Sequence, residues 1–278
     1  MDLSKIYKPR EDWVHKGNFG SVLVVCGSKL YSGSATFAGV SALRAGADLV
    51  AVCAPIYAAS VAAHKIPDLM VFPLNGEQLT TRHINSVLDV AHIRHINSVV
   101  LGCGLGRHVT TTTAIYKLIS KISVPMVLDA DALFAISQKP DAVSGKQVIL
   151  TPHAGELAML INQKMIDEDF DARIVAAKQA ALKYQTVVLL KGHVDIITDG
   201  QSLITNNSGS PYMTKGGFGD TLAGICAALL ARGVGMMEAA YAASYINGEA
   251  GELASKKYGE GVIASDIFEM IPKVINLK

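Results

Sequence analysis

Charged and aromatic side chains are scarce in this sequence. Only 18% of its 278 residues are charged and 6% are aromatic, and the formal net charge is +1. A nearly neutral chain provides no general electrostatic attraction for nucleic acid, and no basic run with interleaved aromatic residues is present. Because half of the residues are hydrophobic, the chain has ample material for a folded core. We therefore expect a folded protein whose partner is a small molecule.

The sequence also lacks cysteine motifs and membrane-targeting signals. Cys26, Cys53, Cys103 and Cys226 are far apart, so no Cys-x-x-Cys metal or redox motif is formed. Buried, reduced thiols are typical of a reducing compartment. The first ten residues have no apolar core of a signal peptide, and no apolar run is long enough to cross a bilayer. These features predict a cytoplasmic protein that does not contact a membrane.

Short apolar runs alternate with segments of helical periodicity. Residues 21–27 are continuously apolar and predict a buried parallel strand, followed by a Gly/Ser-rich loop, an Ala-rich helix and a second strand at 48–54. This order is that of a βαβ unit. Further strands are expected at 98–101, 125–129, 147–150, 186–190, 194–198 and 202–205, and further helices at 81–94, 110–120, from 154, at 167–184, 219–232, 237–256 and 265–275. The pattern predicts an α/β fold with a mainly parallel central sheet and helices on both faces.

A glycine-rich loop precedes the helix expected at 219–232. Glycine can turn successive backbone N–H groups toward one point, and a helix N-terminus adds free N–H groups and a positive dipole end. The loop therefore predicts an anion site, beside which Asp220 places a carboxylate that the dipole should keep ionised. This pattern allows two interpretations: Asp220 caps the helix and the glycines form an ordinary turn, or both serve catalysis.

Polar and glycine-rich residues follow the ends of several predicted strands, where ligands bind in parallel sheets. They are found at residues 27–28, 102–106, 129–131, 151–153 and 191–193. The run at 102–106 has G-x-G-x-G spacing, which argues against a Rossmann dehydrogenase and leaves plain tight-turn glycines as an interpretation. No G-x-x-x-x-G-K-[ST] segment is present, which argues against a P-loop enzyme. We expect these residues to form one rim of the sheet.

Carboxylates on this rim allow two interpretations. Glu156 could lie near the magnesium of a nucleotide, through water, with His153 against substrate; alternatively, Thr151 and Glu156 could cap a helix. Asp129 and Asp131 could also serve magnesium, which takes oxygen ligands and keeps several waters. The alternative for these two residues is a turn or N-cap role.

Together these motifs resemble those of the ribokinase-like superfamily and, within it, the ADP- or ATP-dependent (S)-NAD(P)H-hydrate dehydratase family. The resemblance covers nearly the whole chain and is most specific in residues 128–133, 150–156 and 216–224. The chain has Phe218 where the family usually has Thr, and Cys103 where it usually has Pro. It has Gly33-Ser34-Ala35-Thr36 near the usual Gly-Ala-Pro, which leaves the substrate contact at this point open.

The resemblance implies dehydration of the S form of NADHX or NADPHX to NADH or NADPH, with cleavage of ADP or, alternatively, ATP, and with Mg²⁺ as cofactor. Ala35, Gly104, His153 and Asp220 would contact the hydrate, and Lys191, Gly192, His193, Val194, Asp195 and Gly219 would contact the nucleotide. Asp220 would be the catalytic base, Gly216, Gly217, Phe218 and Gly219 the anion hole, and Glu156 and Asp129 the groups that serve the metal through water.

The resemblance also implies a homotetramer, with residues 1–278 forming one ribokinase-like dehydratase domain. Many relatives carry an epimerase domain as well, for which this sequence has no room. An alternative function is that of a ribokinase-like kinase acting on a vitamin-precursor alcohol, which would use the same loop and Asp220. A third hypothesis is a nucleotide-binding module without turnover. The intact Gly-Gly-x-Gly-Asp motif argues against it.

Overall fold

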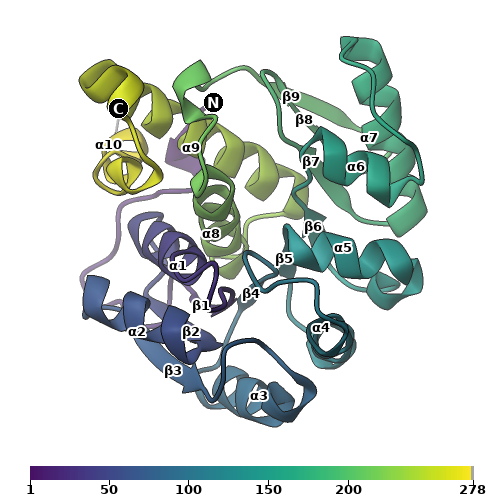
Figure 1. Ribbon diagram of the computed structural model, residues 1–278. Coiled ribbons are helices and arrows are strands. Elements are labelled where there is room, and N and C mark those ends of the chain that lie inside the picture. The colour runs from purple at the N-terminus through teal and green to yellow at the C-terminus, as the bar shows by residue number, and fades with distance from the viewer. Residues whose placement is uncertain (277–278) are drawn as a thin grey trace.

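A single nine-stranded sheet runs through the computed structural model, which describes residues 1–276, and its strand order is β3-β2-β1-β4-β5-β6-β7-β8-β9 (Figure 1). The strands are β1 (Ser21–Val25), β2 (Leu49–Pro55), β3 (Met70–Leu74), β4 (Ser98–Leu101), β5 (Met126–Leu128), β6 (Val148–Leu150), β7 (Val187–Leu190), β8 (Asp195–Thr198) and β9 (Leu203–Asn206). From β3 to β7 all neighbours pair in parallel, and β8 and β9 join antiparallel. The prediction of a mainly parallel α/β sheet is confirmed.

Helices cover both faces of this sheet (Figure 1). The α-helices are α1 (Ser34–Arg44), α2 (Ile56–Lys65), α3 (Ile84–Ile93), α4 (Val109–Lys121), α5 (Asp131–Gln138), α6 (Ala154–Leu160), α7 (Phe170–Tyr184), α8 (Phe218–Ala231), α9 (Met236–Tyr258) and α10 (Ile271–Ile275). Short 3₁₀ turns lie at η1 (Leu3–Lys5), η2 (Thr81–His83), η3 (Pro140–Val143), η4 (Pro211–Met213), η5 (Gly259–Gly261) and η6 (Ala264–Glu269). Helices α1, α2, α8 and α9 pack on one face, and α3 to α7 pack on the other. Within residues 1–276 no helix combines the length and apolar character needed to span a bilayer.

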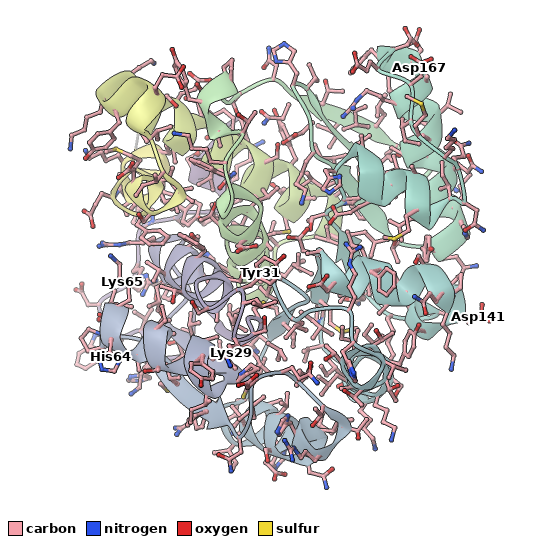
Figure 2. The ribbon with its side chains drawn as sticks, in the orientation of Figure 1. Lys29, Tyr31, His64, Lys65, Asp141 and Asp167 are labelled. Carbon is pink, nitrogen blue, oxygen red and sulfur yellow. The ribbon has the colours of Figure 1, made fainter. Side chains whose placement is uncertain are left out.

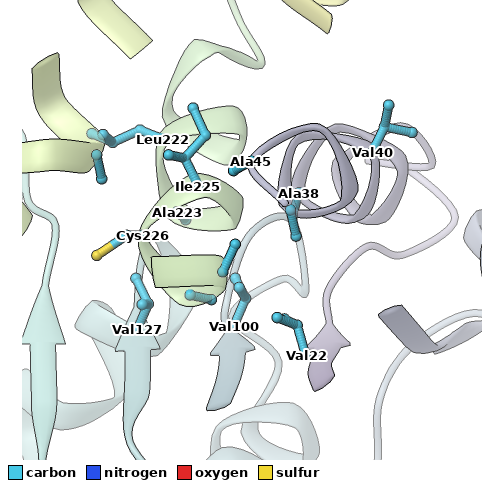
Figure 3. Close-up of a cluster of buried hydrophobic side chains, with 14 of the residues drawn as sticks. Val22, Ala38, Val40, Ala45, Val100, Val127, Leu222, Ala223, Ile225 and Cys226 are labelled. Atoms are coloured by element: carbon cyan, nitrogen blue, oxygen red, sulfur yellow. The ribbon is translucent and has the colours of Figure 1, made fainter. Parts of the chain in front are cut away.

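The continuous apolar runs of the strands are explained by burial on both faces. In β1, Val22 and Val24 face the cluster beneath α1 and α8, whereas Leu23 and Val25 face the opposite cluster. Side chains alternate between the faces of a strand, so a sheet covered on both sides needs apolar residues at every position. Figure 3 shows Val22, Val100 and Val127 in a row along β1, β4 and β5, beneath α1 and α8.

Close packing of α1 against α8 fixes the position of the glycine loop. A Cβ added at Gly224 of α8 would collide with the backbone of Ala38 in α1. Only a glycine allows the two helix backbones to approach this closely. Because α8 begins directly after the glycine loop, this contact determines where the N-terminus of α8 lies relative to the rim of the sheet.

The structure departs from the predicted elements at several places. Elements α2, β3 and α5 were not predicted; β3 is an edge strand that contains Pro73, which weakens a strand signal. The single helix predicted at 265–275 is wrong, because the chain forms η6 and then the short α10. Pro272 explains the break, since proline cannot donate to a preceding turn and its ring clashes with the carbonyl four residues earlier.

Candidate active site

The glycine loop leads into α8 through a left-handed residue. Gly217 is the N-cap of α8 and has a φ of +101°, a conformation that glycine adopts without strain. The N–H of Thr221 bonds to Gly217 O at 3.0 Å and is the first to point back along the helix. The N–H groups of Phe218, Gly219 and Asp220 precede it and have no place in the intrahelical ladder. This arrangement provides the donors and the positive dipole end that bind anions.

Asp220 lies in the first turn of α8 without capping it. The N-cap is Gly217, and the helix has no side-chain cap hydrogen bond, so the capping interpretation of Asp220 is wrong. Ligand atoms of Asp220, Cys103 and Asp129 lie within 4.8 Å of one another. Burial, followed by the like charge of Asp129, raises the pKa of Asp220 to about 7. Burial and the neighbouring carboxylate thus oppose the helix dipole that is expected to keep Asp220 ionised, and they bring the pKa of Asp220 into the neutral range.

A buried ion pair stands beside Asp220. Lys191, which follows β7, places Nζ 2.9 Å from Asp129 Oδ1 and 3.9 Å from Glu156 Oε2. Thr151 Oγ1 also donates to Asp129 Oδ1 at 2.9 Å. Burial favours the neutral form of Lys191, but the two carboxylates outweigh burial and raise its pKa. Burial raises the pKa of Glu156, an effect that Lys191 opposes.

Asp131 holds the glycine-rich turn that follows β4. Its Oδ2 accepts from Gly106 N at 2.7 Å, and its Oδ1 accepts from Arg107 Nε at 3.1 Å. The turn interpretation of Asp131 is thereby confirmed. Gly104, at φ +63°, lies so close to the start of α1 that a Cβ there would be 2.6 Å from Ser34 Oγ. The loop between β1 and α1, on which Figure 2 labels Tyr31, therefore lies directly against this turn.

His153 and Glu156 form a capping box at the start of α6. Nδ1 of His153 accepts from Gly155 N at 3.0 Å, and its backbone N–H donates to Glu156 Oε2 at 2.9 Å. The capping interpretation of Glu156 is confirmed, but His153 takes the cap position predicted for Thr151. Thr151 instead binds Asp129. The His153 side chain is 62% exposed and lines a neighbouring pocket.

A pocket of about 810 Å³ opens next to the ion pair. It is lined by His153, Lys191, Gly192, His193, Asp195, Ser208, Gly209, Ser210, Pro211, Met213, Thr214, Lys215, Phe218, Gly219, Leu222, Ser244, Asn247 and Gly248. This volume is typical of a site for a nucleotide-sized ligand. The residues predicted for the nucleotide thus lie on the pocket wall, with the exception of Val194.

Not every predicted contact residue is accessible. Ala35 is fully buried in α1 and offers no surface, which contradicts a direct contact between Ala35 and the hydrate. Asp195 accepts from Gly192 N at 2.8 Å and from Ser244 Oγ at 2.6 Å, so its carboxylate shapes the 192–195 turn. Burial raises the pKa of Asp195, against the effect of the Ser244 hydrogen bond.

The wall contributed by the 208–215 segment and α9 was not predicted. Asn247 accepts from Thr221 Oγ1 at 2.8 Å and so ties α9 to the first turn of α8. Single polar residues in a long helix carry no motif, and only the packing of α9 against α8 reveals them. Cys103 was noted as a departure from the family pattern, but its place between Asp129 and Asp220 could be seen only in three dimensions.

The sheet order and the glycine loop at the start of α8 define a ribokinase-like fold. A ribokinase-like superfamily protein from Enterococcus faecalis superposes with a TM-score of 0.84 at 22% identity, over 98% of this chain and 92% of that one. The ADP/ATP-dependent NAD(P)H-hydrate dehydratase of Bacillus subtilis, co-crystallized with ATP and Mg²⁺, superposes with a TM-score of 0.80 at 24% identity, over 99% and 96%.

Sequence comparison identifies the family within this fold. Residues 22–273 match the family model for NAD(P)H-hydrate dehydratase. An ADP-dependent (S)-NAD(P)H-hydrate dehydratase of Cenarchaeum symbiosum is 35% identical over 99% of this chain and 94% of its own length. A bifunctional NAD(P)H-hydrate repair enzyme of Methanothermobacter thermautotrophicus is 40% identical over 99% of this chain, which spans 53% of that relative. The chain belongs to the NAD(P)H-hydrate dehydratase family.

Proposed function

We propose that this chain dehydrates the S form of NADHX or NADPHX to the normal reduced cofactor while a nucleotide is cleaved, ADP giving AMP and phosphate. The observation that carries this proposal is the position of Asp220. Its carboxylate, with a pKa of about 7, lies at the N-terminus of α8. The family and its ADP-dependent relatives support the choice of reaction.

In this mechanism Asp220 accepts the proton of the hydrate hydroxyl as the hydroxyl oxygen attacks the terminal phosphoryl group of the nucleotide. A hydroxide is a poor leaving group, whereas phosphate leaves readily. As the new phosphorus–oxygen bond forms, the bond between the terminal phosphorus and the bridging oxygen of the nucleotide breaks. Phosphate then leaves the hydrate, a proton is lost from the neighbouring ring carbon, and the ring double bond forms. The N–H groups of Phe218 and Gly219 would stabilise charge on the transferred phosphoryl group, together with Gly216 and Gly217.

The nucleotide would occupy the pocket beside Lys191, with Gly192, His193, Asp195 and Gly219 around it. One observation supports this placement: all five residues line the same pocket. Val194 would contribute through its backbone at most, since it lies off the wall. The hydrate would lie against Gly104, His153 and Asp220, of which His153 also lines the nucleotide pocket.

Asp129 and Glu156 fit a magnesium ion held through water rather than directly. Lys191 lies between them, 2.9 Å from Asp129 Oδ1 and 3.9 Å from Glu156 Oε2, where a directly bound ion would meet the ammonium. Magnesium usually keeps several waters and binds substrate phosphates, so an ion carried by the nucleotide suits this donor set. When bound, it would neutralise charge on the phosphates.

We further propose that residues 1–278 form one dehydratase domain and that the chain assembles as a homotetramer. A shared sheet from β3 to β9 supports the first of these. Analytical ultracentrifugation would test the second, and a sedimentation coefficient of a monomer would contradict it.

The decisive experiment incubates the protein with enzymatically hydrated NADH and with ADP or ATP in parallel. The absorbance of reduced nicotinamide should return, and mass spectrometry should find AMP and phosphate with ADP but no accumulating phosphorylated hydrate. A stable phosphate ester formed from a vitamin-precursor alcohol would instead support the small-molecule kinase. Nucleotide binding without any turnover would support the non-catalytic module.

A further inference from the structure

The loop between β1 and α1 presents an aromatic side chain at the rim of the sheet. Tyr31 is 57% exposed, whereas Ser34 and Ala35, which follow it at the start of α1, are buried. Since burial excludes a direct contact between Ala35 and the hydrate, this loop can meet a ligand only through an accessible side chain. Tyr31 is the aromatic residue of the loop that has this accessibility.

Hydrogen bonds within the loop hold Tyr31 in place. Its N–H donates to Ser28 Oγ at 3.3 Å, and its carbonyl accepts from the N–H groups of Ser28 and Ser34 at 3.4 Å each. The adjacent Lys29 is also fixed, because its N–H donates to Glu77 O at 2.9 Å. The loop is therefore ordered before a ligand arrives, and binding does not have to supply the cost of ordering it.

Tyr31 begins beside two residues of the proposed hydrate site. A Cβ added at Gly104 would lie 2.6 Å from both Tyr31 Cβ and Ser34 Oγ, so the three residues meet at one point (Figure 2). Burial raises the pKa of Asp220 to about 7, and a hydrogen bond with the Ser34 side chain opposes this rise. Ser34 thus links Gly104 to Asp220. A substrate whose hydroxyl reaches Asp220 past Gly104 comes within reach of the Tyr31 ring.

The ring of Tyr31 is free to take a ligand cation. Within residues 1–276 no lysine or arginine lies over it, whereas Nζ of the neighbouring Lys29 lies 5.4 Å from the centre of the Tyr57 ring. Lys29 is also paired with Glu77, at 2.6 Å. The face of an aromatic ring carries partial negative charge and attracts a cation placed over it.

Loss of phosphate from the hydrate creates such a cation, if the proposed function holds. The carbon that bears the phosphate is bonded to the ring nitrogen. Its C–O bond breaks with the electron pair going to phosphate, while the lone pair of the nitrogen forms a C=N bond. A C–H bond on the next carbon then breaks, its electron pair forms the ring double bond, the nitrogen regains its lone pair, and the departing phosphate takes the proton.

We propose that Tyr31 is a further catalytic residue, whose ring lies against the ring of the hydrate beside Gly104 and stabilises the positive charge that develops as phosphate leaves. This inference rests on the proposed function and adds a group that acts after phosphoryl transfer. Neither the hydrate nor the reduced product carries this charge on its nicotinamide-derived ring. The attraction is therefore strongest in the transition state, where it lowers the barrier.

The test compares the wild type with Tyr31→Phe and Tyr31→Leu, using hydrated NADH and ADP. Tyr31→Phe keeps the aromatic face and should stay within about twofold of the wild type. In Tyr31→Leu the rate constant for phosphate loss should fall by about threefold to thirtyfold, the range of a cation–π contact, with a smaller change in KM. In single turnovers followed by mass spectrometry, phosphorylated hydrate should then accumulate in this variant but not in the wild type.

Tyr258→Leu is the matched control, because Tyr258 is a 42% exposed tyrosine at the end of α9, outside the pocket. It should turn over as the wild type does. Fluorinated phenylalanines at position 31 keep the shape of the ring and withdraw its electrons, so each added fluorine should slow phosphate loss further.

Three results would overturn the role of Tyr31 while the wild type remains active. They are a Tyr31→Leu variant that loses phosphate as fast as the wild type, a Tyr31→Phe variant as slow as Tyr31→Leu, and rates that do not respond to fluorination. A wild type that does not convert the hydrate with ADP or ATP would overturn the proposed function, and the role of Tyr31 with it. The activity of the wild type therefore distinguishes the two failures.

Discussion

Nζ of Lys191 and Oδ1 of Asp129 lie 2.9 Å apart and join the carboxyl ends of β7 and β5 across β6. Asp129 has only 3% of its side chain exposed, and Lys191 places a counter-charge within hydrogen-bond distance of it. A carboxylate buried without a counter-charge is far more costly than the same pair is stabilising. The pair therefore links the stability of the carboxyl ends of β5 and β7 to the charge of the candidate active site.

The first prediction concerns Lys191→Ala. Its free energy of unfolding should fall by about 3 kcal/mol, the lower end for a broken buried pair, because Lys191 retains 22% exposure. Denaturant unfolding measures this loss. Nucleotide affinity, measured by calorimetry, should fall more than hydrate affinity, because Lys191 lines the pocket.

The double variant Lys191→Ala/Asp129→Asn is the control for this prediction. It should be more stable than Lys191→Ala, because the amide leaves no unpaired charge. Equal free energies of unfolding for the single and double variants would show that the ion pair does not stabilise the carboxyl ends of β5 and β7. Unchanged affinity for ADP and ATP in a folded Lys191→Ala protein would remove Lys191 from the nucleotide site.

The second prediction is the pH dependence of turnover. The base form of Asp220 must be ionised, and its pKa of about 7 lies in the working range. The fraction of ionised Asp220, and with it kcat/KM, should therefore rise as the pH increases from about 6 to about 8. Initial rates in buffers of constant ionic strength check this. A profile that is flat over this range would contradict a base with this pKa.

Local patterns predicted much of this molecule, and contacts between distant segments explain what was missed. Apolar runs such as residues 21–27 revealed the strands, because burial on both faces leaves a continuous signal. The glycine loop revealed α8, but the charge state of Asp220 depends on Asp129, 91 positions earlier in the sequence. Likewise, Asn247 on the pocket wall has no neighbouring motif. The pKa of a group depends on what tertiary packing buries with it, which periodicity does not encode.

The third prediction concerns Gly219→Ala. The new Cβ would lie 3.3 Å from Lys191 Nζ and 3.7 Å from Asp129 Oδ2, where the nucleotide is proposed to approach. Alanine suits a helix better than glycine, so the thermal midpoint should not fall. We expect kcat/KM to drop about tenfold to a hundredfold, as for other small misplacements at a reacting centre.

Gly235→Ala is the matched control for Gly219→Ala. Gly235 precedes α9 outside the pocket, has a φ of −59°, and a Cβ there would meet no atom within 4 Å. Its turnover should equal that of the wild type. If Gly219→Ala turns over as fast as Gly235→Ala, the proposed approach of the nucleotide past Gly219 is wrong.

The last prediction is that Asp220→Asn is less active but more stable than the wild type. Turnover should fall by about 10²–10⁴, because an amide cannot act as the base. In the unfolded chain the pKa of an aspartate is about 3.9, whereas in the folded protein that of Asp220 is about 7. Between these values the folded state binds more protons, so this residue makes the wild type lose stability as the pH rises. Asparagine does not titrate and escapes this loss.

Above about pH 7 the variant should therefore unfold with a free energy greater by on the order of 2–4 kcal/mol, and the difference should vanish toward about pH 4. Urea unfolding of both proteins at a series of pH values measures it. Asp199→Asn serves as the control, because hydrogen bonds from Ser202 and Gln201 lower the pKa of Asp199 and predict no gain in stability on its removal. If Asp220→Asn is less stable than the wild type above pH 7, the buried charge of Asp220 does not destabilise the native state. Normal turnover in this variant would show that Asp220 is not the base.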